Sequence, residues 1–410
     1  MIDNGVLASA PRKRGFLFQA GEDQNMKHDE ISLGYVALVD CAPLIVAQEL
    51  GFFDREGLRV RLQREPSWAS LRDHLLFGDL VAAHALAPLP MAATLGVASP
   101  KIPVIAGLVL SLNGNTITVS NALHNLLLQA GMHSAGDPLA VGSALQRLRR
   151  EAPARFPLRF AVVSPVSNHH YQLRHWLRST GLDQEADAQI VVVPPRYMVD
   201  ALRNDEIDAF CVGEPWGSLA AMEGVGHPVV SSYALWNNVM EKVLAVREDW
   251  SAREPEQHQA LLRALLAAGR WLDQDAQRLQ AAPWIAQAIE VPVAAVSAAL
   301  GGAVPGLPAQ ADFHVFHRYA AQYPWLEHGL WLAQQMQHCG QWPAGAVPEA
   351  VVAQVYRGDL YREAAAAVDA PLPINEDSGL GSHASGWKLA GRERDIPMGA
   401  TQFFDGSRLS

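Results

Sequence analysis

The stretch ISLGYVALVDCAPLIVAQELGFFDREGLRVRLQR, residues 31–64, contains the pattern that decides the fold. The apolar run 31–40 predicts a β-strand, and the segment 42–57 predicts a helix that ends near a glycine. Residues 58–64 predict a second strand. A strand, a helix and a strand in this order form a βαβ unit, whose two strands are parallel.

The same alternation of strands and helices continues along the chain. Ser67 predicts the N-cap of a short helix, which is followed by a strand around 80–86 and a loop that contains Pro88 and Pro90. A second series is predicted in the order strand, helix, strand, helix, strand: 158–165, 168–181, 188–195, 198–204 and 207–212. Two α/β lobes with parallel strands and crossover helices are therefore expected.

The two series contain similar segments. LRDHLLFGDLVAAHALAP, residues 71–88, aligns with MVDALRNDEIDAFCVGEP, residues 198–215, and each predicts a helix, a tight turn, a strand and an exit loop with a proline. The identical aligned residues are Asp73 and Asp200, Leu75 and Leu202, Ala82 and Ala209, and Pro88 and Pro215. Both a duplication and convergence on a common supersecondary unit explain this match.

The second segment leaves its strand through distinctive residues. In DAFCVGEPWGSLAAMEGVG, residues 208–226, an apolar strand stops at Gly213, Glu214, Pro215 and Trp216. Ligands of open α/β sheets bind beyond the carboxyl ends of strands, where a glycine lets the backbone approach the ligand and a proline fixes the direction of exit. An ordinary strand end with turn residues is the alternative explanation.

Composition limits the possible classes of protein. The chain has 410 residues, 49% of them apolar, which exceeds the usual size of a single core and agrees with two lobes. The formal net charge of −10 disfavours a groove of Lys and Arg that binds nucleic acid directly. The longest apolar runs, such as 102–112, are too short to span a membrane.

The N-terminal segment and the cysteines favour a cytoplasmic protein. Residues 1–30 are polar, lack the pattern of a secretory signal and predict a flexible N-terminal extension. Cys41, Cys211 and Cys339 are widely separated, without the spacing of a metal or redox motif, so buried structural thiols are expected.

Seven segments along the chain carry a family resemblance: DCAPLIVAQELGFF, SWASLRD, LNGNTITVS, HHYQLRHWL, VVVPP, FCVGEPW and MEKVLAV. In order and approximate spacing they resemble the nitrate-binding and bicarbonate-binding proteins of bacterial ABC importers. The resemblance covers residues 31–260 well and the helical remainder loosely. It implies a bilobal, type II periplasmic-binding-protein fold with α/β lobes that close around one small anion.

The resemblance also implies a ligand site. It places five residues around the anion: Trp68 of SWAS, Asn113 of LNGN, His169 of NHHYQ, Gly213 of VGEPW and Lys242 of MEKV.

Two further residues are candidates for the same site. Nitrate binders of the family usually have a glutamine where Asn113 is placed, so Asn115 is an alternative source of the amide. Glu214 either orients the cleft backbone or pairs with Lys242 in the absence of ligand.

The chemistry of this set suits nitrate or nitrite. It offers an indole N–H, an amide, an imidazole N–H, a backbone N–H and an ammonium group to the acceptor oxygens of a planar anion. A buried anion without a positive partner is costly, so Lys242 is expected to be essential. In bicarbonate-binding relatives an acidic residue that helps to hold calcium replaces this lysine, so neither a metal nor a cofactor is expected.

Each candidate also has a plain structural explanation. Trp68 fits a core position, His169 or its neighbour His170 fits a core or surface histidine, and Lys242 fits a solvated lysine. If the implied site is right, alanine at Lys242 or at His169 weakens anion binding strongly and leaves the fold intact.

The strand order and the resemblance together predict the division of the chain. Residues 31–115 and 218–371 are expected to form lobe 1, whose later part is helical, and residues 116–217 are expected to form lobe 2. Residues 372–410 are rich in Gly, Ser and charge, and predict a tail that wraps the body or stays mobile.

Three functions follow as hypotheses. The first, implied by a resemblance to intracellular nitrate/nitrite sensors, is a cytoplasmic sensor that controls assimilation genes by sequestering an RNA-binding antiterminator, for which an acidic surface is suitable. The alternative is the substrate-binding component of a nitrate ABC importer. The third is an enzyme, since similar folds serve thiamine-pyrimidine synthesis, but the sequence has neither a cysteine cluster nor a catalytic motif, so no catalytic residue is expected.

Overall fold

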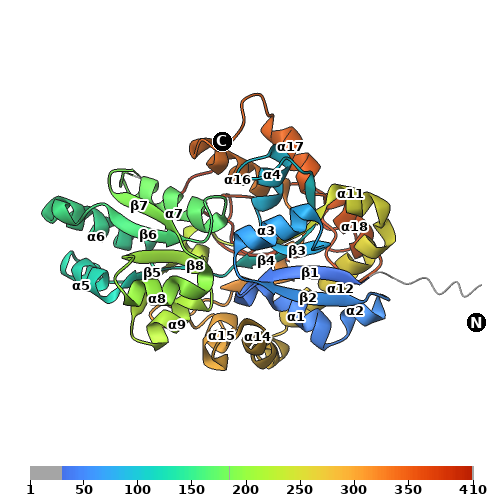
Figure 1. Cartoon of the computed structure of the whole chain (residues 1–410), viewed down its shortest axis with the longest axis horizontal. Coiled ribbons are helices and arrows are strands. Elements are labelled where there is room, and N and C mark those ends of the chain that lie inside the picture. The colour runs from blue at the N-terminus through green and yellow to red at the C-terminus, as the bar shows by residue number, and fades with distance from the viewer. Residues whose placement is uncertain (1–29, 184, 409–410) are drawn as a thin grey trace, which may run out of the picture.

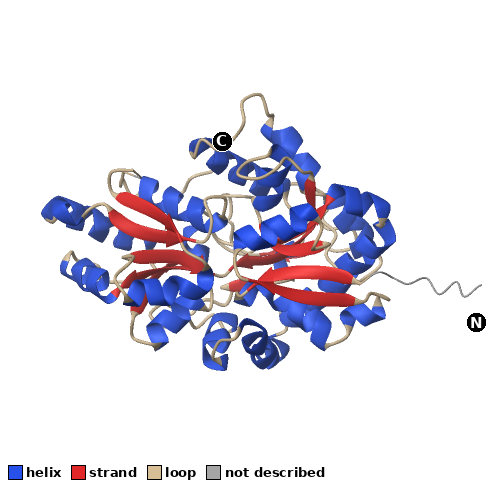
Figure 2. Cartoon of the chain, viewed as in Figure 1, coloured by secondary structure: helices blue, strands red, loops and turns tan. Residues whose placement is uncertain are grey.

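Two separate β-sheets lie side by side in the computed structural model, which describes residues 30–183 and 185–408 (Figures 1 and 2). Apart from Glu30, the predicted N-terminal extension lies outside the described residues. Helices cover both faces of each sheet, as expected for a bilobal α/β protein (Figure 2).

The sheet of lobe 1 has the strand order β11-β4-β10-β3-β1-β2. Its strands are β1 (Ile31–Val36), β2 (Val60–Glu65), β3 (Ala82–Leu86), β4 (Val104–Asn113), β10 (Met240–Arg247) and β11 (His314–Val315). Its first helices are η1 (Val39–Cys41), α1 (Ala42–Glu49), α2 (Phe52–Arg55), α3 (Trp68–Phe77) and α4 (Leu89–Leu95). The predicted βαβ unit is present, with β1 and β2 parallel.

The sheet of lobe 2 has the order β7-β6-β8-β5-β9. Its strands are β5 (Asn115–Ser120), β6 (Leu158–Val162), β7 (Ala188–Val192), β8 (Ala209–Gly213) and β9 (Gly226–Ser231). Its helices are α5 (Asn121–Gln129), α6 (Pro138–Glu151), η2 (Pro153–Arg155), α7 (Asn168–Ser179), η3 (Pro195–Tyr197), α8 (Met198–Arg203), α9 (Trp216–Met222) and α10 (Ser232–Leu235).

Local sequence sets the start of the two helices that face the other lobe. The Ser67 hydroxyl accepts from the Ser70 backbone N–H at the start of α3, and the Ser167 hydroxyl accepts from the His170 N–H at the start of α7. The predicted helix 42–57 is divided into α1 and α2 because Gly51 adopts a left-handed conformation, with φ of 66°.

The sheets are mixed, which corrects the expectation of purely parallel strands. The strands β5 and β10 each run antiparallel to both neighbours. The reason is the path of the chain: each of these strands enters its sheet from the junction between the lobes, the end at which its neighbours β8 and β4 finish.

The chain passes between the lobes twice. The first crossing is at Gly114, whose φ is 90° and where an added Cβ would collide with the imidazole ring of His314. The second crossing follows α10, at residues 236–239. The predicted boundary at 217–218 is therefore wrong: α9 and β9 belong to lobe 2, because β9 pairs with the free edge of β5.

Helices after β10 pack mainly against lobe 1, and α12 contacts α1, α18 and β4. Two of them, α15 and α16, also contact α9 and α7 of lobe 2. The elements of this region are α11 (Glu248–Arg253), α12 (Pro255–Leu272), α13 (Asp275–Arg278), η4 (Leu279–Ala281), α14 (Ala282–Ile289), α15 (Val293–Leu300), η5 (Arg318–Ala320), α16 (Leu326–His338), α17 (Pro348–Val355) and α18 (Gly358–Ala366).

The described part of the C-terminal tail wraps the body. It contains the hairpin β12 (Trp387–Leu389) and β13 (Ile396–Met398) and then pairs with the second crossing. The Asn237 N–H donates to the Gln402 carbonyl, and the Phe404 N–H donates to the Leu235 carbonyl. Of the two expectations for the tail, the structure therefore shows wrapping.

Phe403 anchors this tail and provides a test of its importance. The side chain is 4% exposed, and its ring stacks on Trp236 with centroids 4.8 Å apart. We expect Phe403→Ala to lower the free energy of unfolding by about 3 kcal/mol, because it leaves a cavity where the tail meets both lobes. Urea denaturation measures this change.

Phe77→Ala is the matched control, because Phe77 is 66% exposed. Its effect is expected to stay within about 0.5 kcal/mol. Equal effects of the two substitutions would contradict a structural role for the tail.

Candidate functional site

Five ionisable side chains are buried together at the junction between the lobes: Asp40, His84, His169, Glu241 and Lys242, named here the buried charge cluster. Asp40 lies in η1 just after β1, and His84 lies in β3. Glu241 and Lys242 are adjacent in β10, while His169 near the start of α7 is contributed by lobe 2. The cluster therefore joins the carboxyl end of β1, the middle of β3 and the start of β10 in lobe 1 to a helix start of lobe 2.

Lys242 is the centre of the cluster. Its Nζ lies 2.7 Å from Asp40 Oδ2 and 2.9 Å from Glu241 Oε1. Asp40 Oδ1 lies 2.8 Å from His84 Nε2, and Glu241 Oε1 lies 3.6 Å from His169 Nε2. One ammonium group thus serves two buried carboxyl groups.

The protein environment shifts the pKa values of the two carboxyl groups in opposite directions. Burial raises the pKa of Asp40, but the charge of Lys242 and the hydrogen bond from His84 outweigh burial and hold this pKa well below its usual range. Burial lowers the pKa of Lys242, but Asp40 and Glu241 outweigh it and raise this pKa. For Glu241, burial dominates over Lys242 and raises the pKa.

Both histidines of the cluster are neutral near pH 7. Burial lowers the pKa of His84 against the attraction of Asp40. Burial and the charge of Lys242 together lower the pKa of His169 well below its usual value. A neutral imidazole presents one N–H donor and one acceptor nitrogen.

Trp68 and Gly213 border the cluster. The indole of Trp68 is buried, its ring centroid is 5.7 Å from Lys242 Nζ, and its Nε1 has no hydrogen-bond partner among the described residues. Gly213 ends β8, where an added Cβ would lie 3.3 Å from Leu38 and 3.4 Å from Asn115 Oδ1. The structure therefore brings four sequence-predicted residues together, namely Trp68, His169, Gly213 and Lys242.

Asn113 does not share this environment. Its Nδ2 donates to the Asp312 carbonyl and to Asn238 Oδ1, and its Oδ1 accepts from the Val239 N–H. Both ends of the amide are thus occupied in holding the two crossings together. Its placement among the ligand-binding residues is corrected for this reason.

Asn115 is the asparagine that faces the cluster. Its side chain is a hydrogen-bonding neighbour of Glu241, and its Nδ2 donates to Gln172 Oε1 at 3.2 Å. It lies beside Gly213 because the two residues are paired across β5 and β8. Asn115 is therefore the asparagine whose amide lies beside the cluster.

Glu214 supports the cleft backbone and does not pair with Lys242. Its carboxyl group accepts from Thr116 Oγ1 at 2.8 Å and from the Ser218 N–H at 2.9 Å. Its carbonyl accepts from the Val39 N–H of lobe 1. The alternative of an ion pair with Lys242 is wrong because Asp40 and Glu241 occupy that ammonium group.

Several polar atoms at the cluster lack a hydrogen-bond partner among the described residues. They include Trp68 Nε1, Gln172 Nε2, Glu241 Oε2 and both ring nitrogens of His169. Buried polar groups are normally hydrogen-bonded, so such a concentration requires an explanation. The indole and amide groups are donors, which suits a small anion with several acceptor oxygens.

Sequence reasoning missed Asp40, His84, Gln172 and Glu241. The signal that could have found two of them is a lone polar residue inside an apolar run: Asp40 in YVALVDCAPLIV and His84 in VAAHALAP. A charged or titratable residue in a buried segment needs a charged or hydrogen-bonding partner, so such a residue indicates a buried polar site.

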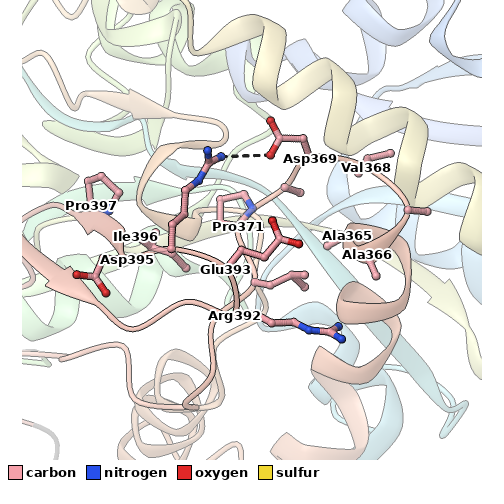
Figure 3. A pocket seen from close by; sticks show the side chains of 14 residues that line it. Ala365, Ala366, Val368, Asp369, Pro371, Arg392, Glu393, Asp395, Ile396 and Pro397 are labelled. Carbon is pink, nitrogen blue, oxygen red and sulfur yellow. Dashed lines mark hydrogen bonds and ion pairs between the residues drawn. The ribbon is translucent and has the colours of Figure 1, made fainter.

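Cavities do not by themselves identify the site. A cavity of about 140 Å³ opens beside Trp68, between α4 of lobe 1 and residues 163–166 of lobe 2. A larger hollow of about 660 Å³ lies between the end of α18 and the tail hairpin, where Asp369 accepts from Arg394 (Figure 3). The charged side chains that line this hollow have both signs and are exposed to solvent. They therefore differ from the buried donors of the cluster.

Two searches of the described residues returned nothing. No group of three or more His, Cys, Asp and Glu side chains in residues 30–183 and 185–408 is arranged to hold a metal ion. No helix in this part of the chain combines the length and apolar character needed to cross a membrane.

The chain is similar to several known proteins. The model of the NMT1-like family matches residues 24–286. The nitrate/nitrite binding protein NrtA of Synechococcus elongatus is 30% identical over 395 residues, which cover 92% of this chain and 82% of that protein.

The nitrate import ATP-binding protein NrtC of Synechocystis sp. is 34% identical over 345 residues, which cover 82% of this chain. The chain spans only 49% of the length of that protein. Among solved structures, the periplasmic nitrate-binding protein NrtA of Synechocystis superposes with a TM-score of 0.77 at 27% identity. That superposition covers 93% of this chain and 95% of the NrtA chain.

Proposed function

The chain belongs to the NMT1-like family, and from this premise we propose that it binds nitrate or nitrite between its lobes as the substrate-binding component of an ABC importer. The observation that carries the proposal is the buried ammonium group of Lys242, surrounded by unpartnered donors from both lobes. The relatives named for nitrate and nitrite binding support it.

The donor set fits an acceptor-only anion. Trp68 and Lys242 come from lobe 1, whereas Asn115, His169 and Gln172 come from lobe 2. An anion that contacts donors from both lobes stabilises the closed arrangement of the lobes. The stabilisation cannot exceed the difference in the anion's binding free energy between the closed and open states. A transporter partner then recognises the closed form that anion binding stabilises.

The importer component is preferred over the sensor. The relatives compared above are named for nitrate binding and nitrate import, and none of their names refers to an antiterminator. They are also named for binding and transport functions and not for chemistry on nitrate. Cell fractionation distinguishes the two roles, because an importer component acts outside the membrane and a sensor acts in the cytoplasm.

Calorimetric titration with nitrate, nitrite and bicarbonate tests the proposal, with one bicarbonate run in the presence of calcium. We expect saturable binding of nitrate or nitrite with one anion per chain. Binding of bicarbonate alone, or of none of these anions, would contradict the proposal.

The two asparagines at the first crossing allow a discriminating test. Asn115→Ala is expected to weaken anion binding about tenfold, because one hydrogen bond to a charged ligand is lost. Asn113→Ala is expected to leave the affinity for the anion nearly unchanged. It is expected to lower the free energy of unfolding by about 2 kcal/mol, because it leaves buried hydrogen-bonding groups at the crossing without a partner. Titration and urea denaturation of both variants measure these effects, and the reverse pattern would restore Asn113 to the site.

A further inference from the structure

The charges of the buried cluster do not balance once an anion is added. With Asp40 and Glu241 both ionised, Lys242 supplies one positive charge against two negative charges. His84 and His169 are neutral, since burial lowers the pKa of each. A bound monoanion would then bring the buried site to a net charge of −2, which a low-dielectric interior strongly disfavours.

Glu241 is the group able to remove this excess. Its side chain is fully buried, with Oε1 2.9 Å from Lys242 Nζ and 3.6 Å from His169 Nε2. Its other oxygen, Oε2, has no hydrogen-bond partner among the described residues. Asp40 is less suitable, because Lys242 and His84 hold both of its oxygens.

Within residues 30–183 and 185–408, Lys242 forms an ion pair with Glu241, and neither an arginine nor another lysine does. The titratable groups that act on Glu241 from neighbouring elements are Asp40 of η1, His169 of α7 and Cys211 of β8. His84 of β3 and His314 of β11 interact with Asp40 and not with Glu241 itself. Burial raises the pKa of Cys211 and lowers the pKa of His314 to about 3, so these two groups are uncharged near pH 7.

We propose that Glu241 is the proton-holding residue of the site, so that nitrate or nitrite binds together with one proton from water. This inference rests on the proposed function. In the binding step the Glu241 carboxylate gains a proton while the anion enters, and the net charge of the site stays the same. The protonated carboxyl group then offers an O–H donor to the acceptor-only anion.

The same residue influences which anion is chosen. A protonated Glu241 donates to nitrate, whereas an ionised Glu241 accepts a hydrogen bond and repels an anion that has no donor of its own. Bicarbonate carries an O–H group and satisfies an ionised carboxylate better than nitrate does. The preference for nitrate over bicarbonate should therefore fall as the pH rises.

Calorimetry of the full chain with sodium nitrate and with sodium nitrite measures the proton directly. Titrations at pH 6, 7, 8 and 9, each in two buffers of different ionisation enthalpy, give the number of protons taken up for each anion bound. We expect uptake that approaches one proton and an affinity that falls by up to about tenfold for each pH unit as the pH rises through the titration of Glu241.

Glu241→Gln is the assigning variant, because an amide donates like the protonated acid and carries no charge. It is expected to bind nitrate without proton uptake and with an affinity that no longer depends on pH. Glu65→Gln is the matched control, since Glu65 is a buried carboxyl group of the same lobe that bonds to Ser70 and His74 and to none of the cluster. Its proton count should equal that of the native chain.

The outcomes separate the two ideas. Binding of nitrate or nitrite with no proton uptake at any pH overturns the proton inference and leaves the proposed function standing. Uptake that persists in Glu241→Gln overturns the assignment to Glu241. Absence of binding at every pH overturns the proposed function and the inference with it. If Glu241→Gln fails to fold, the native proton count still decides whether the anion binds together with a proton.

Discussion

Lys242→Met is expected to abolish measurable nitrate and nitrite binding and to lower the free energy of unfolding by about 3 kcal/mol. Lys242 is the positive group of the buried charge cluster. Its Nζ lies 2.7 Å from Asp40 Oδ2 and 2.9 Å from Glu241 Oε1. Without it, a buried anion has no opposite charge, and Asp40 loses the partner that keeps it ionised. The effect on stability corrects the expectation from sequence alone that the fold would be untouched.

A double variant separates the two consequences of losing Lys242. In Lys242→Met with Asp40→Asn, the uncompensated carboxylate is removed, so about 2 kcal/mol of stability should return. Anion binding should remain absent, because no ammonium group has been restored. Urea denaturation and calorimetry of the native chain, the single variant and the double variant measure both effects. Recovery of binding in the double variant would show that Lys242 is only structural.

His169→Ala is expected to weaken anion binding about 100-fold, a change of about 2.7 kcal/mol. His169 is fully buried, comes from lobe 2 and faces Glu241 of lobe 1, so its loss removes a donor and an interlobe contact together. Its pKa lies well below the usual value because of burial and Lys242, so the imidazole is neutral throughout the range from pH 6 to 8. The ratio of native to variant affinity should therefore be constant over this range.

His170→Ala is the matched control for His169. The two residues are adjacent in α7, and burial also lowers the pKa of His170, to about 4. Its ring packs edge-on against Tyr171 and contacts none of the buried charge cluster. We expect its affinity for nitrate to change less than about threefold. Comparable losses in the two variants would mean that α7 is disturbed as a whole and that His169 has no specific role.

The alternation of apolar strands with helices was enough to predict most of the two α/β lobes. The prediction of α3 rested on the capping serine Ser67, which the structure shows, and β1 and β2 follow an apolar pattern. The helix α7 was predicted without a cap, and the structure adds Ser167 as the residue that caps it. The boundary of lobe 2 was missed because β9 contains Pro228, which weakens the local signal of a strand, and because its hydrogen-bonding partner, β5, lies far earlier in the chain. Pairing between distant strands has no local signal.

The candidate site was predictable to the extent that a motif marked each residue. Trp68, His169, Gly213 and Lys242 stand in recognisable motifs, and the structure brings them together. Asp40 and Glu241 also stand in the quoted segments, but the resemblance gave them no role, because their importance comes from a three-dimensional balance of charge. Asn113 and Asn115 are two positions apart, and only the hydrogen bonds of the folded chain distinguish them.

The position of β10 between β3 and β4 has a consequence for biosynthesis. The ribosome releases β3 and β4 early. The strand β10, which lies between them in the sheet, consists of residues 240–247 and emerges only after the whole of lobe 2. Every strand of lobe 2 lies between residues 115 and 231, so its sheet can be completed while the middle of the lobe 1 sheet is still unfilled. The lobe that comes second along the chain is therefore the first that can finish folding on the ribosome.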